Sequence, residues 1–166
     1  MADSNLFTIT RTFNAPRELV WSVWTEAEHL ARWFGPKGLT THVHKMELKN
    51  DGIFLYSMRS DDGFEMWARW IFRDIKKPES ITLIQTFSDP NGGIARYPEM
   101  ESWPLHTLSK TTFSEIDGKT TVNLQWSTYE ADEAEVKIFN EAFSDMNNGW
   151  SETLNQLEIY LNSIQR

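Results

Sequence analysis

The chain has 166 residues, 40% of them hydrophobic and 24% charged, and a formal net charge of −8 at pH 7. This length and balance predict one globular domain spanning residues 1–166, and the negative charge argues against general nucleic-acid binding and against binding to anionic membranes. Cysteine is absent, and no apolar run has the length of a membrane span or the character of a signal peptide, so we expect no thiol chemistry, no membrane insertion and a cytoplasmic location.

The first part of the chain predicts a strand followed by two short helices. Apolar residues alternate with threonines over residues 6–14, which indicates a strand. Pro16 stands where a first helical turn begins. Thr25 and Glu28 have capping-box spacing, so we expect a second helix there, meeting the first at a kink. The Gly-Pro pair at 35–36 ends it.

The middle of the chain predicts an antiparallel meander. Apolar and polar residues alternate in six segments, and turn sequences such as the Asp-Gly pairs at 51–52, 62–63 and 117–118 separate several of them. Residues 89–104 form the longest irregular stretch, which is either a functional lid or a surface loop. The expected strands are Thr40–Leu48, Ile53–Arg59, Phe64–Arg73, Ser80–Ser88, His106–Ile116 and Thr120–Thr128.

One long helix is predicted for residues 132–164. Asp132 and Glu135 have the spacing of a capping box at its start. Eight large apolar residues then follow at steps of three or four, on one face of a helix about 45 Å long. This face needs a broad apolar surface, so we predict an α+β fold in which a curved seven-stranded antiparallel sheet, with the first strand at an edge, wraps around the long C-terminal helix. The eight residues are Phe139, Phe143, Met146, Trp150, Leu154, Leu157, Leu161 and Ile164.

Three poor helix formers interrupt this helix at residues 147–149, directly before Trp150. Two interpretations are open. The segment is a tolerated weak point or slight bend. Alternatively, Gly149 thins the helix so that a ligand or strand can approach, and Trp150 closes one end of that space.

Three sequence blocks resemble a known group of proteins. They are Pro-x3-Val-Trp-x2-Trp-Thr at 16–25, His-Leu-x2-Trp-Phe-Gly-Pro at 29–36, and Gly-Trp-x3-Leu-x2-Leu-x2-Tyr-Leu at 149–161. Together they resemble the START-like helix-grip (SRPBCC) superfamily, in the branch similar to the C-terminal domain of the activator of the heat-shock-protein-90 ATPase. The resemblance covers about residues 6–164. It implies a hydrophobic cavity between the long helix and the sheet, and ligand binding without an established reaction.

Aromatic residues are the main candidates for a ligand site. Eight Trp, ten Phe and four Tyr indicate large apolar walls, which either surround an open cavity, as the resemblance implies, or fill a dry core. Arg69 is included because an arginine between aromatic residues binds a ligand carboxylate or stacks on Trp67. The predicted ligand-binding residues are Trp24, Trp33, Phe34, Tyr56, Arg69, Trp70, Phe87, Trp126, Phe143, Met146 and Trp150, with Phe54 beside them.

Catalytic and metal sites find less support. The sequence contains no nucleophile elbow, phosphate loop or dinucleotide-binding glycine motif, so we predict no catalytic residue, metal or cofactor. His42 and His44 share one strand face and could begin a metal site, but the sequence identifies no Glu or Asp of matching geometry, which favours an exposed strand face. Glu65 and Glu101 are the carboxylates that could act as a general acid or base if the cavity buries them, and solvated surface charge is the alternative.

The preferred prediction is a binding protein for a small apolar or aromatic molecule, which gains about 25 cal/mol per Å² of apolar area removed from water. A cyclase- or hydrolase-type enzyme using the same cavity, with Tyr56 or a carboxylate transferring protons, is the second hypothesis. A chaperone-associated stress protein, as the family name implies, is the third; the chain shows no separate N-terminal domain like that of full-length activators, which counts against it. The sequence leaves a homodimer open, with an exposed Trp21 or the sheet edge as the contact.

Overall fold

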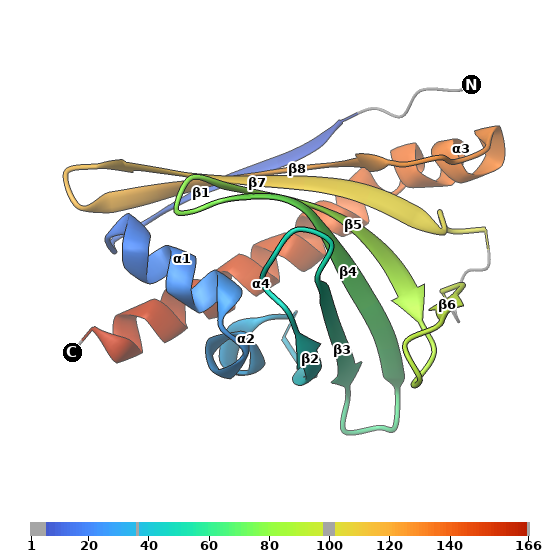
Figure 1. Cartoon of the computed structure of the whole chain (residues 1–166), viewed down its shortest axis with the longest axis horizontal. Coiled ribbons are helices and arrows are strands. Elements are labelled where there is room, and N and C mark those ends of the chain that lie inside the picture. The colour runs from blue at the N-terminus through green and yellow to red at the C-terminus, as the bar shows by residue number, and fades with distance from the viewer. Residues whose placement is uncertain (1–5, 36, 98–101, 166) are drawn as a thin grey trace.

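The computed structural model describes residues 6–35, 37–97 and 102–165 (Figure 1). In chain order the elements are β1 (Phe7–Phe13), α1 (Arg17–Thr25), α2 (Ala27–Trp33), β2 (Thr40–Met46), β3 (Ile53–Arg59), β4 (Glu65–Lys76), β5 (Ser80–Ser88), β6 (Ile94–Ala95), β7 (His106–Ile116), β8 (Lys119–Thr128), α3 (Glu133–Glu141) and α4 (Phe143–Ile164). None of the helices in the described ranges combines the length and the apolar character that crossing a membrane requires.

The strands form one antiparallel sheet in the order β1-β8-β7-β5-β4-β3-β2, and the two-residue strand β6 pairs with β5 beside this path. The predicted meander, with the first strand at an edge, is therefore confirmed. The bounds of β3, β5 and β7 match the predicted bounds. The sequence analysis missed β6, because two residues are too short to show an alternating pattern.

The sheet curves around α4, which crosses its concave side (Figure 1). Because side chains alternate along a strand, the register brings bulky apolar residues together on this side: Phe54 lies opposite Trp70, and Tyr56 lies opposite Ala68. All four are buried. The α4 stripe supplies Leu154, Leu157 and Leu161, which are also buried. The predicted α+β fold, with a helix packed in a bent antiparallel sheet, is confirmed.

The C-terminal helix departs from the prediction because it consists of two helices. α3 ends at Glu141 and α4 begins at Phe143, and Ala142 between them has φ −94° and ψ 5°. The capping box of Asp132 and Glu135 is confirmed. Apolar spacing could not show the break, because a single non-helical residue leaves the three-or-four step between Phe139 and Phe143 unchanged.

The kink between α1 and α2 is confirmed, but the predicted capping box is wrong. Thr25 is the last residue of α1, and its hydroxyl donates a 2.8 Å hydrogen bond to the carbonyl of Trp21 instead of capping α2. The N-cap of α2 is Glu26, without a side-chain cap bond. Trp21 is buried with its ring centroid 5.4 Å from that of Phe113, so it is not an exposed dimer contact.

Gly149 does not thin the helix for a close neighbour. A Cβ atom built on it meets nothing within 4 Å, so the backbone there faces open space. We therefore expect Gly149→Ala to raise the free energy of unfolding by about 0.5–1 kcal/mol, because alanine has the higher helix propensity. Urea unfolding would measure the change.

A second glycine provides the control for this substitution. Gly118 also has nothing within 4 Å of an added Cβ, but its φ is +76°. We expect Gly118→Ala to destabilise the protein by about 1 kcal/mol, because alanine is strained in that conformation. Loss of stability in Gly149→Ala would contradict our account of residue 149.

Candidate functional site

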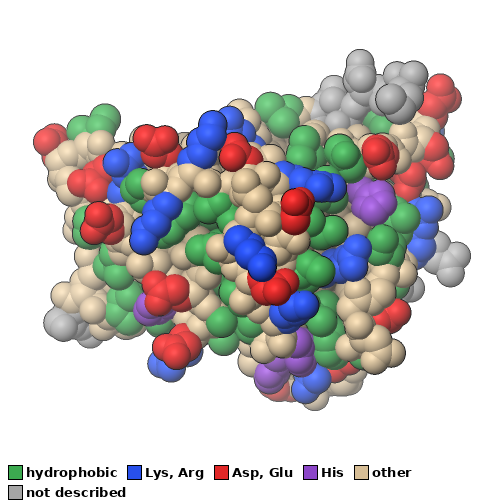
Figure 2. All heavy atoms as spheres, in the orientation of Figure 1, with side chains coloured by type: hydrophobic (Ala, Val, Ile, Leu, Met, Phe, Trp, Pro, Cys, Tyr) green, Lys and Arg blue, Asp and Glu red, His purple; other side chains and the backbone are tan. Residues whose placement is uncertain are grey.

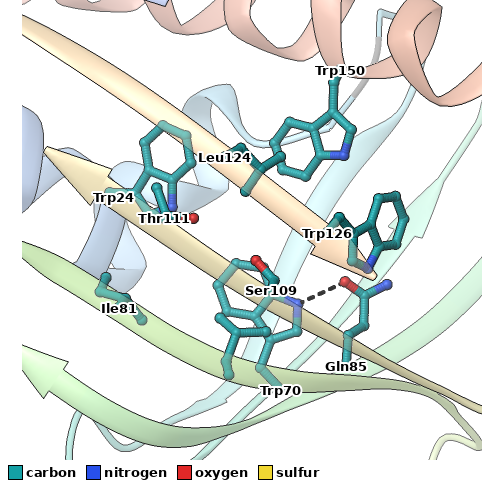
Figure 3. Close-up of a pocket in the computed structure, with 10 residues that line it drawn as sticks. Trp24, Trp70, Ile81, Gln85, Ser109, Thr111, Leu124, Trp126 and Trp150 are labelled. Atoms are coloured by element: carbon teal, nitrogen blue, oxygen red, sulfur yellow. Dashed lines mark hydrogen bonds between the residues drawn. The ribbon is translucent and has the colours of Figure 1, made fainter. Parts of the chain in front are cut away.

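A small space lies between α4, α1 and the concave face of the sheet (Figure 3). Its volume is about 20 Å³, which is room for about one water molecule. Ligand pockets commonly measure about 300–1,000 Å³, so aromatic side chains nearly fill this region. The lining residues are Trp24, Trp70, Ile81, Leu83, Gln85, Ser109, Thr111, Leu124, Trp126 and Trp150.

Strand alternation explains which residues line the space. Residues two apart on β5, β7 and β8 point to the same face, and the register aligns these strands with β4. Gln85 lies opposite Trp70, and Ser109 lies opposite Trp126. Trp24 from α1 and Trp150 from α4 cover the space from the helical side (Figure 3).

Polar groups reach the lining from strands β4, β5, β7 and β8. The Nε1 atom of Trp70 donates a 3.2 Å hydrogen bond to Oε1 of Gln85. Ser109 and Thr111 add two buried hydroxyl-bearing side chains. The Nε1 atom of Trp126 is buried and has no hydrogen-bond partner among the described residues. No lining residue carries a carboxylate, imidazole or ammonium group, so the lining offers hydrogen bonds and apolar contact.

Four of the eleven predicted ligand-binding residues line this space: Trp24, Trp70, Trp126 and Trp150. Trp33, Phe34 and Tyr56 are buried in the surrounding core cluster instead. The ring centroid of Phe34 lies 5.3 Å from that of Trp70 and 6.1 Å from that of Trp150. These core residues therefore support the walls from behind.

The remaining predicted residues lie farther out. Phe143 and Met146 pack in a second cluster with Phe7 and Phe139. Phe87 stacks on Tyr97, with ring centroids 4.6 Å apart.

Arg69 lies on the other side of the sheet from the space, because it is adjacent to inward-facing Trp70 on β4. Its Nε donates to the hydroxyl of Thr86 at 3.2 Å, and its Nη1 donates to the carbonyl of Gly92 at 3.0 Å. These bonds attach the turn before β6 to the sheet.

The sequence analysis missed the non-aromatic lining residues. Ser109 and Thr111 have side chains that are common on solvent-facing strand positions, so they were not considered for an interior site. Strand alternation could have indicated two other lining residues. Gln85 lies two residues from Phe87, and Leu124 lies two residues from Trp126, so each shares a strand face with a predicted residue.

The candidate proton-transfer groups lie outside the space. Glu65 is exposed, pairs with Arg59 and accepts a 2.7 Å hydrogen bond from Nε1 of Trp67, which lowers its pKa. Burial raises the pKa of Tyr56 far above the usual range and keeps its hydroxyl protonated. Glu101 lies outside the described residues.

His44, one of the two histidines of β2, contacts its neighbours in the sheet. The ring of His44 stacks on Trp67 with centroids 4.2 Å apart, and its Nε2 lies 2.9 Å from the hydroxyl oxygen of Ser57. Burial lowers the pKa of His44, and the positive charge of the nearby Arg59 lowers it further. Within the part of the chain that the structure describes, no three or more His, Asp or Glu side chains are grouped to hold a metal ion.

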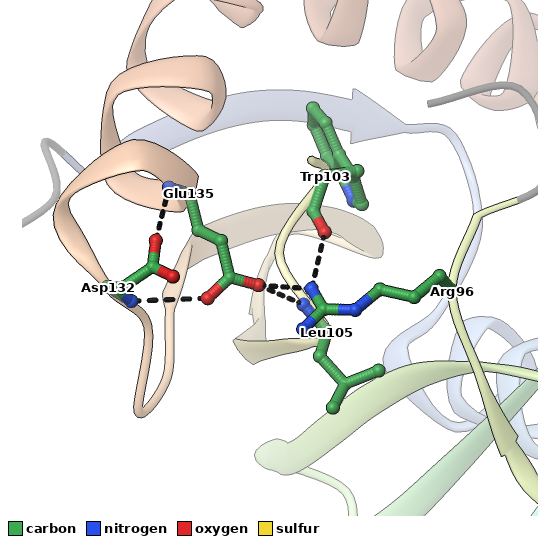
Figure 4. A network of polar contacts seen from close by, with 5 residues as sticks. All are labelled: Arg96, Trp103, Leu105, Asp132 and Glu135. Carbon is green, nitrogen blue, oxygen red and sulfur yellow. Dashed lines mark hydrogen bonds and ion pairs between the residues drawn. The ribbon is translucent and has the colours of Figure 1, made fainter. Parts of the chain in front are cut away.

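A polar network joins α3 to the segment before β7 (Figure 4). Oε2 of Glu135 accepts from Nη1 of Arg96 at 2.6 Å and from the backbone N–H of Leu105 at 2.9 Å. Oε1 accepts from the backbone N–H of Asp132 at 3.1 Å. Arg96 also donates to the carbonyl of Trp103 at 3.4 Å. The network therefore fixes Trp103, whose ring packs near Trp126 and Phe139.

Glu135 makes this network pH-dependent. Burial alone would raise its pKa, but the hydrogen bonds from Asp132, Arg96 and Leu105 outweigh burial and lower the pKa below 4.5. A carboxyl with a depressed folded-state pKa contributes stability above its unfolded pKa and loses it as the pH falls through the folded pKa. We expect Glu135→Gln to cost about 2 kcal/mol at pH 7, by urea unfolding.

The cost of Glu135→Gln is expected to be constant above about pH 5 and to shrink below pH 4.5. Glu133→Gln is the matched control, because Glu133 lies exposed in the same helical turn. It is expected to change the free energy of unfolding by less than about 0.5 kcal/mol. A cost at Glu135 that stays constant down to pH 3 would contradict the assignment.

The face in Figure 2 shows acidic and basic side chains interspersed with hydrophobic ones. This distribution agrees with charges that keep a folded surface hydrated rather than with a continuous basic stripe on this face.

Comparisons with known proteins agree with this architecture. The family model described as "Activator of Hsp90 ATPase homolog 1-like protein" matches residues 14–162. No curated protein matches the chain. A solution structure from Staphylococcus epidermidis has a TM-score of 0.73 and 26% identity, over 98% of this chain and 93% of the other.

Two further solved structures share the fold. A protein from Arthrobacter aurescens has a TM-score of 0.79 at 23% identity, over 98% of this chain and 92% of its own. The AHSA1 protein from Silicibacter pomeroyi has a TM-score of 0.70 at 16% identity, over 98% of this chain and 100% of its own. At these identities the likeness concerns the fold.

Proposed function

The chain belongs to the activator of Hsp90 ATPase homolog 1-like protein family, and from that premise we propose that it binds a small, largely apolar molecule between α4 and the sheet. The START-like helix-grip fold is generally a ligand-binding fold. The proposal concerns where the ligand binds in this chain and what chemistry it has.

The convergence of four indoles on one space carries the proposal. Trp24, Trp70, Trp126 and Trp150 come from α1, β4, β8 and α4, and few polar side chains stand among them (Figure 3). Aromatic walls with a few placed polar groups are typical of pockets for small organic molecules. Each Å² of apolar ligand surface removed from water would contribute about 25 cal/mol.

The small volume of the space requires a wall residue to move when a ligand enters. Trp24 and Trp70 are 3% and 5% exposed, so the partly buried Trp126 and Trp150 are the candidates to move. The ring of Trp126 packs against three other aromatic rings, which leaves Trp150 for this role. Trp150 also packs against both hydrophobic clusters, so its displacement would join the space to the region around Phe143 and Met146. A ligand would then occupy the volume that the indole leaves.

The chemistry of the lining favours binding over a cyclase or hydrolase reaction. General acid–base catalysis needs a titratable group within hydrogen-bonding reach of the substrate. The polar side-chain groups around the space are indole, amide and hydroxyl groups only. Glu65 lies at the surface in an ion pair with Arg59, so it does not provide the missing carboxylate.

A titration with indane, a hydrocarbon with one aromatic ring, would test the proposal. We expect saturable changes in the ¹H–¹⁵N resonances of the lining tryptophans. Ser109→Leu is expected to weaken binding by more than about tenfold, because leucine would fill the space. Ser114→Leu is the matched control, since Ser114 is exposed on the same strand. It is expected to bind like the parent.

Two outcomes would contradict the proposal. One is the absence of saturation in the parent protein, up to the solubility limit, both with indane and with the corresponding ketone 1-indanone. The other is equal affinity of the parent and the Ser109→Leu variant. Native mass spectrometry of freshly purified protein would separately show whether a small molecule co-purifies with the chain.

A further inference from the structure

We infer that the site selects neutral molecules that carry a hydrogen-bond acceptor, of the carbonyl class, beside their apolar rings, and that Trp126 Nε1 donates the selecting hydrogen bond. This inference rests on the proposed function, because it concerns a ligand in the same space. It adds the chemical class of that ligand and the residue that recognises it.

The unpartnered indole of Trp126 is the starting observation. Its Nε1 atom is buried and finds no acceptor among the described residues. Buried polar groups in folded proteins almost always have a partner, and a donor left without one costs about 1–3 kcal/mol. An acceptor atom brought by a ligand would remove this cost.

The packing around Trp126 holds its ring in place. Its centroid lies 5.7 Å from that of Phe139 at an interplanar angle of 90°, and 6.3 Å from that of Phe7 at 75°. Trp103 lies 6.4 Å away and is itself held by Arg96. The indole thus packs against three aromatic rings while another part of it lines the space, so the donor is oriented before a ligand arrives.

Gln85 lines the same space and offers a further donor. Gln85 accepts from Trp70 through Oε1, so its amide nitrogen, which carries two hydrogens, is directed elsewhere. Figure 3 shows the nitrogen of Trp126 on the side of its ring that faces Gln85. A ligand oxygen within reach of both side chains would accept a hydrogen bond from each.

The charge of the lining limits the acceptor to a neutral group. No lysine, arginine or histidine lines the space, so a buried carboxylate or phosphate would lack a counter-charge. A ketone, ester or amide oxygen accepts hydrogen bonds without that cost. A hydrocarbon of the same shape would leave the Trp126 donor unpaired.

The test compares 1-indanone with indane, which differ by one carbonyl in place of one methylene group. Both would be titrated into the full chain and into Trp126→Phe, which removes the donor but keeps an aromatic ring. We expect Trp126→Phe to weaken 1-indanone about tenfold and indane less than about twofold. In the parent, 1-indanone is expected to move the resonance of the Trp126 indole proton downfield, because that proton gains a hydrogen bond, whereas indane is not expected to give this downfield shift. The resonance is assigned to Trp126 by its absence from the spectrum of Trp126→Phe.

Trp150→Phe is the control, because it alters the same space without touching the proposed donor. It is expected to change the affinities of both probes by the same factor. If Trp126→Phe weakens both probes equally, the inference is overturned while the proposed function stands; a water held by Trp126 in the parent would give this result. If neither probe binds the parent, the proposed function fails and the inference fails with it.

Discussion

Leu157→Ala is expected to lower the free energy of unfolding by about 3–5 kcal/mol, because the side chain is fully buried on α4 and its removal leaves a cavity in the main core. Such a loss is a large share of the roughly 5–15 kcal/mol that holds a typical domain folded. Urea unfolding followed by far-UV circular dichroism would measure it, since the loss of helix and sheet is then observed together.

The matched control lies two residues away on the same helix. Ile159 is 64% exposed, so Ile159→Ala removes a similar number of carbon atoms without opening a cavity. We expect it to change the free energy of unfolding by less than about 0.5 kcal/mol. Equal losses in the two variants would contradict the arrangement in which the sheet covers the Leu154–Leu157–Leu161 face of α4.

Trp24→Ala is expected to cost about 3–5 kcal/mol and to create a binding site for indole. The side chain is 3% exposed, its centroid lies 4.9 Å from that of Trp33, and it lines the space beneath α4. Deleting it would enlarge that space by most of an indole ring. Added indole should refill the volume and stabilise the variant by about 1.4 kcal/mol at ten times its Kd.

Thermal unfolding with and without indole would measure this recovery. Trp67→Ala is the control, because Trp67 stacks on His44 on the opposite side of β4 from the space. Indole is expected to raise the midpoint temperature of unfolding of Trp24→Ala more than that of the parent. It is expected to change the midpoint temperature of Trp67→Ala by the same amount as that of the parent. Equal increments in the three proteins would show that indole acts elsewhere.

The candidate site was predictable in part. Trp24, Trp70, Trp126 and Trp150 could be chosen because large aromatic residues on inward-facing positions of the predicted elements must be buried somewhere central. Arg69 was misplaced for a specific reason. Adjacent strand residues point to opposite faces of the sheet, so Arg69 and Trp70 must lie on different faces. Because both faces of β4 carry aromatic residues, the sequence does not show which of them is concave.

By itself the sequence determined most of the elements and the order of the seven main strands in the sheet. Apolar residues at every second position indicate a strand, apolar residues at steps of three and four indicate a helix face, and Asp-Gly pairs indicate turns between antiparallel strands. Each of these patterns depends only on residues that are close in the sequence. Tertiary structure alone decided the volume of about 20 Å³ and the unpartnered nitrogen of Trp126. The volume of the space and the unpaired donor both depend on how side chains from α1, α4 and the strands of the sheet pack together. The positions of all these side chains are needed at once to determine them.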